Sequence, residues 1–338
     1  MLNQKNKNIS LLIVWTVATY LLYLCFREIE LELAWNQIKQ ARPFWLTLGI
    51  MGHFSIFIFW ARQWILFLPS TTTVSFKRMF EVNALMSTAM STLPFPGGHA
   101  FGVFLLAKKE RVGHPAALSV MSLDQLAEGI AKLTILFIVG WLTPLPPLMK
   151  QGIFGLVVII FLFLCVLLYF AYRFRKYKES GVSYHRTRKE KIIHFLSRWG
   201  HQLEGLRNPR IFFYGVILAY GMKLGEASAI WGIQQSFDVN LPIWSALLIL
   251  AALNLTTLVP LAPGNLGVYE ATVFFIYQYL GIPPEQALVL ALVQHLCYLL
   301  PMAGTGYIFI LLKNIIPEKL PQKKNMANPK HILENERV

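Results

Sequence analysis

Long apolar runs alternate with short polar segments along the whole chain. A helix needs about 20 mainly apolar residues to cross a bilayer. Runs near or above that length cover residues 11–26, 44–68, 116–142, 152–172, 211–237, 243–261 and 287–312. Only helices and closed barrels satisfy their backbone hydrogen bonds in lipid, and these runs are too long and unbroken for barrel strands. The pattern therefore predicts an all-α, polytopic integral membrane protein.

Two apolar regions are interrupted by proline and glycine and then resume as a short apolar helix. The first interruption contains Pro94, Pro96, Gly97 and Gly98. The second contains Pro260, Pro263, Gly264, Asn265 and Gly267. Interrupted segments at corresponding places in two halves are the best sequence indication of a transporter binding site. Two ordinary proline-kinked helices are the alternative, because Pro and Gly are common in spanning helices.

The regions around the interruptions resemble each other in sequence. AALSVMSLDQL, which begins at Ala116, aligns without gaps with QALVLALVQHL, which begins at Gln286. The alignment predicts two repeat units, at about residues 44–142 and 211–312, within one transmembrane domain of residues 1–312. Each unit is predicted to contain a helix, a broken re-entrant hairpin and a long helix.

The distribution of charge predicts how these units are oriented. Residues 173–210 hold eleven Lys and Arg against three Glu, and residues 313–338 hold six against three. The positive-inside rule assigns both the linker and the tail to the cytoplasm. Both termini are then cytoplasmic, and the two hairpins enter the membrane from opposite faces. The result is about eight membrane segments, including two re-entrant hairpins, in an inverted-topology repeat.

Composition narrows the classes of function that remain. The chain has 338 residues, of which 55% are hydrophobic and 14% charged, and a net charge of +14. Because the basic residues lie beside the spans, they indicate topology or contact with anionic headgroups and not nucleic acid. Cys25, Cys165 and Cys297 lie far apart in apolar segments, so no disulfide framework or zinc site is predicted. The sequence has no nucleotide-binding glycine loop with Lys-Ser/Thr and no H-E-x-x-H motif, so we expect no cofactor, metal or catalytic residues.

The broken hairpins are the first group of candidate binding residues. A helix that starts at membrane depth presents backbone N–H groups and a partial positive charge, which suit a phosphate. The candidates at the first break are Pro96, Gly97, Gly98 and His99. Those at the second are Pro263, Gly264, Asn265, Gly267, Tyr269 and Glu270. The glycines would let a ligand approach the backbone closely. The alternative is that they only permit tight helix packing.

Ionisable residues inside the spans are the second group, because each costs about 2.5–3.5 kcal/mol or more at the bilayer centre. Asp124, Glu128 and Lys132 follow at intervals of four on one helix face. Glu128 and Lys132 are spaced to neutralise each other, which leaves Asp124 without a local partner.

Four further ionisable residues lie in the second half of the chain. Lys223 and Glu226 form a comparable pair three residues apart. Glu270 has no basic neighbour in sequence and is the stronger candidate. His295 follows Gln294, which takes the place of Asp124 in the second repeat, and it is either an interior packing residue or a proton relay.

The segment PGNLGVYE, from Pro263 to Glu270, is similar to the P-G-G-x-G-x-x-E pattern of the flippase-like family defined by the transmembrane region of lysylphosphatidylglycerol synthase. Asn265 replaces one glycine. The first hairpin departs from the family, which often has Gly-Arg and Gly-Glu where this chain has Gly98-His99 and Gly102-Val103. The resemblance covers about residues 11–312. It implies lipid translocation across a bacterial inner membrane, without the aminoacyltransferase domain of fused members.

The hypothesis from sequence is therefore a non-enzymatic lipid translocase. Its expected partners are membrane lipids, namely an anionic phospholipid or a lipid-linked phosphate, and a homo-oligomer is left open. One alternative is an integral-membrane transferase acting on a lipid-linked substrate, which would need clustered carboxylates. Another is an ion-coupled transporter of a small solute.

Overall fold

The computed structural model describes residues 16, 19–27, 30–93, 96–177, 187–258 and 262–313, and these contain helices and no strands. The first half contains α2 (Leu31–Gln40), α3 (Pro43–Leu66), α4 (Phe76–Thr92), α5 (Gly97–Phe104), the π-helix η1 (Leu105–Lys109), α6 (His114–Leu142) and α7 (Pro147–Arg173). The second contains α8 (Arg188–His201), α9 (Glu204–Arg207), α10 (Pro209–Ser236), α11 (Trp244–Thr256), the 3₁₀ turn η2 (Pro263–Asn265), α12 (Val268–Tyr279) and α13 (Pro284–Lys313).

Some predictions fall on residues outside these ranges. They include part of the first predicted span, residues 94–95 and 259–261 at the breaks (with Pro94 and Pro260), part of the basic linker, and the tail from residue 314. The all-helical class predicted from the apolar runs is confirmed for the described residues.

Four helices in the described ranges are long and apolar enough to cross a membrane. They are Pro43–Leu66, His114–Leu142, Met149–Arg173 and Pro284–Leu312. The predicted run at residues 211–237 forms the 28-residue α10, which carries Lys223 and Glu226 near its middle and is not among these four. The run at residues 243–261 contains a helix of only 13 residues, Trp244–Thr256. The chain is a multi-pass membrane protein in which α11 is too short to span by itself.

Helices α3 and α10 pack antiparallel through small residues. A Cβ atom on Gly52 would lie 2.9 Å from the Gly225 carbonyl oxygen, and one on Gly225 would lie 2.9 Å from the Gly52 carbonyl oxygen. Farther along the pair, Gln63 Nε2 donates to the Gly215 carbonyl at 2.8 Å. Small residues let helix backbones approach closely when no hydrophobic force between helices operates in lipid. This pair sets the position of α10 relative to α3.

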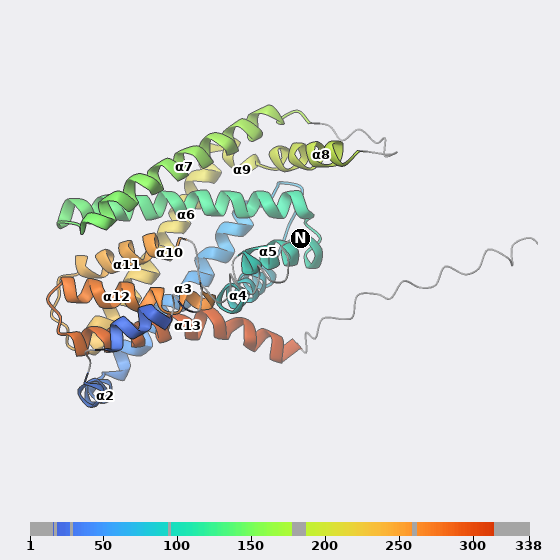
Figure 1. The fold of residues 1–338 in the computed structure, drawn as a ribbon. Coiled ribbons are helices and arrows are strands. Elements are labelled where there is room, and N and C mark those ends of the chain that lie inside the picture. Colours follow the sequence, from blue (N-terminus) through green and yellow to red (C-terminus); the bar gives the residue numbers. More distant parts are fainter. Residues whose placement is uncertain are drawn as a thin grey trace, which may run out of the picture.

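The helix pairs α4–α5 and α11–α12 lie toward opposite ends of the bundle (Figure 1). Helix α4 packs on α5 and α13, whereas α11 packs on α12 and α6. The pair α4–α5 lies toward the end that holds α8 and the end of α13, and α11–α12 lies toward the other. On α4, Thr88 Oγ1 donates to the Ala303 carbonyl of α13 at 2.6 Å, a contact between the two halves of the chain.

The described part of the basic linker is folded onto the bundle. Helices α8 and α9 pack against α7, and α8 also contacts α6. Trp199 is buried, and Arg207 donates from Nη1 to the Ala171 carbonyl at 3.0 Å and from Nη2 to the His201 carbonyl at 2.8 Å. These bonds attach α9 to the end of α7.

Candidate functional site

A cavity of about 450 Å³ lies at the centre of the bundle, where both helix breaks meet. Helices α3, α4, α6, α10, α11 and α13 contribute to its wall as well. The candidate residues that line it are Pro96, Gly98, His99, Asp124, Glu128, Glu226, Gly264, Asn265 and Tyr269. Gly97, Pro263, Gly267, Glu270 and His295 are outside its lining. The fold therefore brings residues from both predicted repeat units to one cavity.

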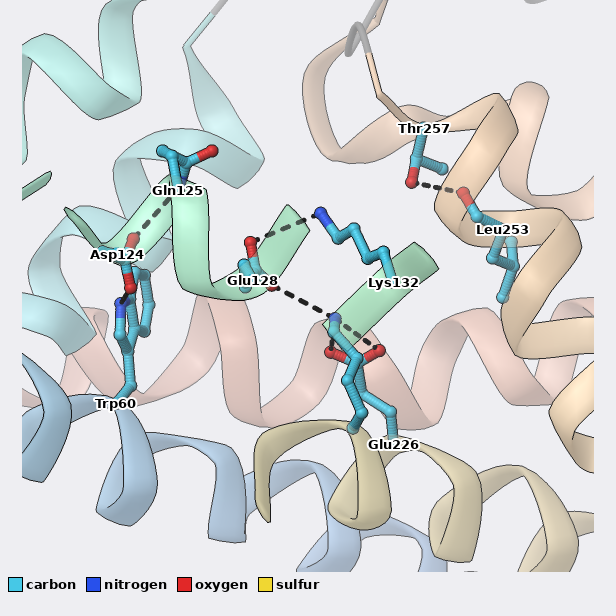
Figure 2. Close-up of polar contacts among 9 residues, drawn as sticks. Trp60, Asp124, Gln125, Glu128, Lys132, Glu226, Leu253 and Thr257 are labelled. Carbon is cyan, nitrogen blue, oxygen red and sulfur yellow. Dashed lines mark hydrogen bonds and ion pairs between the residues drawn. The ribbon is translucent and has the colours of Figure 1, made fainter. Parts of the chain in front are cut away.

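Four charged side chains form one network on the α6 and α10 side of the cavity (Figure 2). The two pairs expected from spacing are present, because Lys132 Nζ lies 3.3 Å from Glu128 Oε2 and Lys223 Nζ lies 2.8 Å from Glu226 Oε1. Lys223 Nζ also lies 3.1 Å from Glu128 Oε1, which joins the pairs across the two helices. Two lysines then balance two glutamates, so the network is neutral when all four are charged.

Asp124 adds a further carboxylate to the cavity. It is only 1% exposed and accepts hydrogen bonds from Trp60 Nε1 at 3.1 Å and from Gln125 Nε2 at 3.0 Å (Figure 2). The sequence expectation concerned a charged partner, and the neighbour in sequence that contacts Asp124, Gln125, is a neutral donor. No ion pair in the described part of the chain includes Asp124. It is therefore held by two neutral donors.

The second break is organised by a chain of hydrogen bonds behind the cavity wall. His295 Nε2 lies 2.9 Å from the Gly264 carbonyl oxygen, and His295 Nδ1 lies 2.8 Å from Glu270 Oε1. Glu270 Oε2 accepts from the Gly267 backbone N–H at 2.7 Å. Because a carbonyl oxygen only accepts, Nε2 of His295 carries a hydrogen, and the bond between Nδ1 and Glu270 requires a second hydrogen on Nδ1 or on the carboxyl group. Glu270 has no basic neighbour in sequence but has His295 in space.

An acidic side chain lies at the start of the helix after the second break. Helix α12 begins at Val268, and the carboxyl group of Glu270 in its first turn accepts from the Gly267 N–H at the N-cap. An acidic group in the first turn stabilises the positive end of a helix and disfavours a second anion there. Glu270 therefore acts as a cap, and anion binding at this helix end stays a prediction.

Tyr269 is the aromatic part of the same wall. Its ring stacks on His295 with centroids 4.2 Å apart and planes at 10°, and its hydroxyl accepts from Gln294 Nε2 at 3.1 Å. Tyr269 lines the cavity while His295 lies outside its lining. The stack keeps the tyrosine ring in place at the cavity surface.

The first break has a different construction. Helix α5 starts at Gly97 after Pro96, and the first N–H groups of an α-helix have no acceptor within the helix. A Cβ on Gly98 would lie 2.5 Å from the Cα and backbone nitrogen of Met90, and one on Gly102 would lie 2.2 Å from Met86 Sδ. Gly98 is thus required for the packing of α5 on α4, which supports the packing alternative at this position.

Sequence reasoning missed several residues of the cavity. Trp60, Asn254, Thr257 and Tyr298 line it and were not among the candidates. Asn254 had a signal, because it is a polar residue in the otherwise apolar run of α11. The aromatic residues had none, since Trp and Tyr are ordinary components of spanning helices.

These observations define a multi-pass helical membrane protein with a buried polar cavity between two helix breaks. The family "Lysylphosphatidylglycerol synthase TM region" matches residues 9–306, so the chain belongs to this family and the resemblance expected from sequence is confirmed. A UPF0104 membrane protein of Archaeoglobus fulgidus is 27% identical, with 75% of this chain and 81% of the relative covered. No solved structure matches the chain.

Proposed function

We propose that this protein is a lipid translocase that moves a phosphate-bearing lipid across the membrane. The observation that carries the proposal is the central cavity, which both helix breaks and five buried or partly buried charged side chains line. The headgroup passes through this cavity, and the acyl chains stay in the bilayer. Charged groups inside a membrane protein mark substrate or ion pathways.

The packing supports an inverted repeat built from residues 44–142 and 211–312. In such a repeat α3, α4 and α6 correspond to α10, α11 and α13. The contact of α4 with α13 then corresponds to the contact of α11 with α6. The contact of α10 with α6 likewise becomes that of α3 with α13, and α3 and α10 pair with each other at the centre. The hairpins at opposite ends of the bundle fit the same exchange (Figure 1). Such repeats open a central site alternately to the two faces of a membrane.

The size of the cavity supports a headgroup as the part of the ligand that enters it. Its volume of about 450 Å³ is within the range of pockets that bind drug-sized ligands. That range suits a lipid headgroup and is well below the volume of a whole phospholipid. The acyl chains therefore remain outside.

In this proposal the phosphate binds at the first break and not at the second. The N-terminus of α5 begins at Gly97, next to the lining residues Pro96 and Gly98, whereas Glu270 already occupies the start of α12. Lys132 also lines the cavity and supplies a cation. The phosphate would approach the α5 end and Lys132 together.

A second pocket of about 530 Å³ lies after α5, and in it Lys109 pairs with Glu81 and Arg78 with Glu110. Arg78, Lys109 and Arg111 line it together with Glu81 and Glu110. Basic residues beside a membrane attract anionic headgroups, at about 1 kcal/mol each. These residues would gather anionic lipid at the cytoplasmic mouth, with both termini cytoplasmic and the protein in a bacterial inner membrane.

Transport of a labelled lipid in vesicles tests the proposal. The purified protein is reconstituted in phosphatidylcholine vesicles with a small fraction of a fluorescent anionic phospholipid, and a membrane-impermeant quencher measures exchange between leaflets. We expect faster exchange than in protein-free vesicles and in vesicles with Asp124→Asn. Equal rates in all three would refute translocation. A chemically altered headgroup on the recovered lipid would instead favour the transferase, and uptake of a soluble solute without lipid exchange would favour the solute transporter.

A further inference from the structure

The carboxylates and lysines that line the central cavity do not balance one another. Lys132 and Lys223 offset Glu128 and Glu226 in the network. Asp124 lines the same cavity, is 1% exposed and takes part in no ion pair of the described residues. An ionised Asp124 therefore leaves the cavity with one net negative charge. A buried charge without a partner is so costly that the group becomes neutral instead.

A proton suits the position of Asp124 better than a larger cation does. The side chain is almost inaccessible, and both of its oxygens already accept a hydrogen bond, from Trp60 Nε1 at 3.1 Å and from Gln125 Nε2 at 3.0 Å. Across the described ranges, no group of three or more His, Cys, Asp or Glu could hold a metal ion. A proton needs no space of its own and no further ligands.

The amide of Gln125 is able to serve both protonation states of Asp124. A glutamine side chain carries an NH₂ donor and a carbonyl acceptor. Nε2 of Gln125 donates to Oδ2 of Asp124, as a carboxylate requires (Figure 2). Rotation of the amide by half a turn would place its oxygen there to accept from a carboxylic acid, while Trp60 still donates to Oδ1. Asp124 therefore keeps its hydrogen bonds whether the proton is bound or released.

Other titratable side chains face Asp124 across the cavity. They are His53 on α3, His99 on α5, Glu128 and Lys132 on α6, Lys223 and Glu226 on α10, Tyr269 on α12 and Tyr298 on α13. The other elements packed on α6, which are η1, α7, α8 and α11, add no titratable side chain to the lining. The two histidines are the other groups that commonly exchange protons near neutral pH. The experiment must therefore separate Asp124 from them.

An anionic headgroup makes the proton part of the transport step. In the proposed function the phosphate enters this cavity near Lys132, so an ionised Asp124 would be a second negative charge without a cation. Like charges repel strongly where water is excluded. A proton on Asp124 removes that repulsion, so the headgroup and the proton favour each other's binding.

We propose that Asp124 is a proton-binding site and that the protein moves one proton together with each anionic headgroup. This inference rests on the proposed lipid translocation and names what drives it. The proton passes from water to Asp124 at one face and returns to water at the other, and no bond of the lipid changes. One proton balances the single charge of a phosphodiester, so the transport step moves no net charge.

A pH gradient across vesicles tests the coupling. Phosphatidylglycerol with a fluorescent acyl chain is placed in phosphatidylcholine vesicles that contain the protein, and an impermeant quencher measures the label in each leaflet at steady state. One proton per lipid predicts about tenfold accumulation in the leaflet on the alkaline side for each unit of pH difference, since both correspond to about 1.4 kcal/mol. A membrane potential alone should leave the label evenly distributed. Protein-free vesicles under the same gradient give the background.

Four variants assign the proton to a particular side chain. Asp124→Asn should distribute the label evenly under the gradient, and Asp124→Glu should restore the accumulation. The matched control is Glu81→Gln, because Glu81 is also a buried carboxyl group but pairs with Lys109 and does not line the central cavity. Glu81→Gln and His99→Asn should both keep the accumulation, whatever their rates, because a steady-state ratio does not depend on the rate.

The pH dependence of lipid binding gives a readout that does not require transport. In detergent, phosphatidylglycerol should raise the thermal midpoint of the wild-type protein at acidic pH and progressively less as Asp124 loses its proton. In Asp124→Asn the increase should be the same at every pH. Trp60→Phe removes a donor that binds a carboxylate more strongly than a neutral acid. It should therefore shift the loss of the effect to higher pH, which a purely structural role of Asp124 would not produce.

Each other outcome overturns a specific part of the proposal. An even distribution of the label by a wild-type protein that exchanges lipid overturns proton coupling while lipid translocation stands. Accumulation that follows a sodium gradient and not the pH gradient overturns the proton as the coupled cation. Accumulation that survives in Asp124→Asn overturns the assignment to this residue. No exchange of lipid at all overturns the proposed function itself.

Discussion

Nζ of Lys223 on α10 lies 3.1 Å from Oε1 of Glu128 on α6. This contact converts two ion pairs, each within one helix, into a single network between α6 and α10. Lys223 is central to it, because its side chain is 4% exposed and Glu226 has no other cation among the ion pairs of the described residues. The network therefore holds α6 against α10 at the cavity.

The network predicts unequal effects of two charge-removing changes. Lys223→Met leaves Glu226 without its cation, and breaking a buried pair costs about 3–5 kcal/mol. The double change Glu128→Gln with Lys132→Met leaves the pair of Lys223 and Glu226 intact, so it should lower thermal stability little. Thermal unfolding in detergent should show a much lower midpoint for Lys223→Met than for the double variant. Equal midpoints would contradict the central role of Lys223.

Asp124 is expected to matter for transport more than for folding. Asp124→Asn keeps the shape and an acceptor for Trp60 Nε1 but removes the charge. We expect normal insertion and an unchanged thermal midpoint, with lipid exchange lowered by about tenfold or more, as for an intramembrane carboxylate on a substrate pathway. The variant Trp60→Phe, which removes only one donor, should have a smaller effect. Full exchange by Asp124→Asn would remove this residue from the site.

Glu270 and His295 are expected to act as one structural unit. Replacing His295 with Phe leaves the Gly264 carbonyl without its donor, and an unsatisfied buried group costs about 1–3 kcal/mol. Glu270→Leu removes the cap of α12 and the other bond of His295. The double variant should be little worse than either single variant, because residues in one hydrogen-bond network are not additive. Additive losses of thermal stability would show that the two residues act separately.

Substitution of Gly98 is expected to disturb folding and not ligand binding alone. A Cβ at this position overlaps the backbone of Met90 at 2.5 Å, so Gly98→Ala should lower the yield of folded protein together with transport. Gly155→Ala on α7 is the matched control, because nothing lies within 4 Å of its Cβ position. A stable but inactive Gly98→Ala protein would instead support a role for this glycine in ligand approach.

The predicted orientation is tested by cysteine labelling. In a protein without its three native cysteines, Pro147→Cys and Lys189→Cys place thiols at exposed positions at the start of α7 and on α8. We expect Lys189→Cys to react from the cytoplasmic side and Pro147→Cys from outside. Val239 is a poor labelling position because it is only 3% exposed. Labelling of both positions from one side would remove the basis of the inverted repeat.

The sequence by itself determined what depends on local periodicity. Apolar runs predicted α3, α6, α7 and α13, and the proline and glycine clusters predicted where α4 and α11 end. The pair of Glu128 and Lys132 followed from helical spacing, because residues four apart are neighbours on any helix. The family pattern from Pro263 to Glu270 was likewise readable without a structure.

Tertiary structure alone decided which helix faces meet. Helical spacing says nothing of the rotation and depth of one helix against another, and close packing such as that of Gly52 on Gly225 sets both. That packing brings Lys223 to Glu128 and encloses the cavity. It also brings His295 next to Glu270, so that these two candidate binding residues hydrogen-bond to each other. The lack of a hydrogen-bond partner for the Asn254 amide could not be predicted from the sequence either, because the neighbours of a side chain in space are known only from the fold.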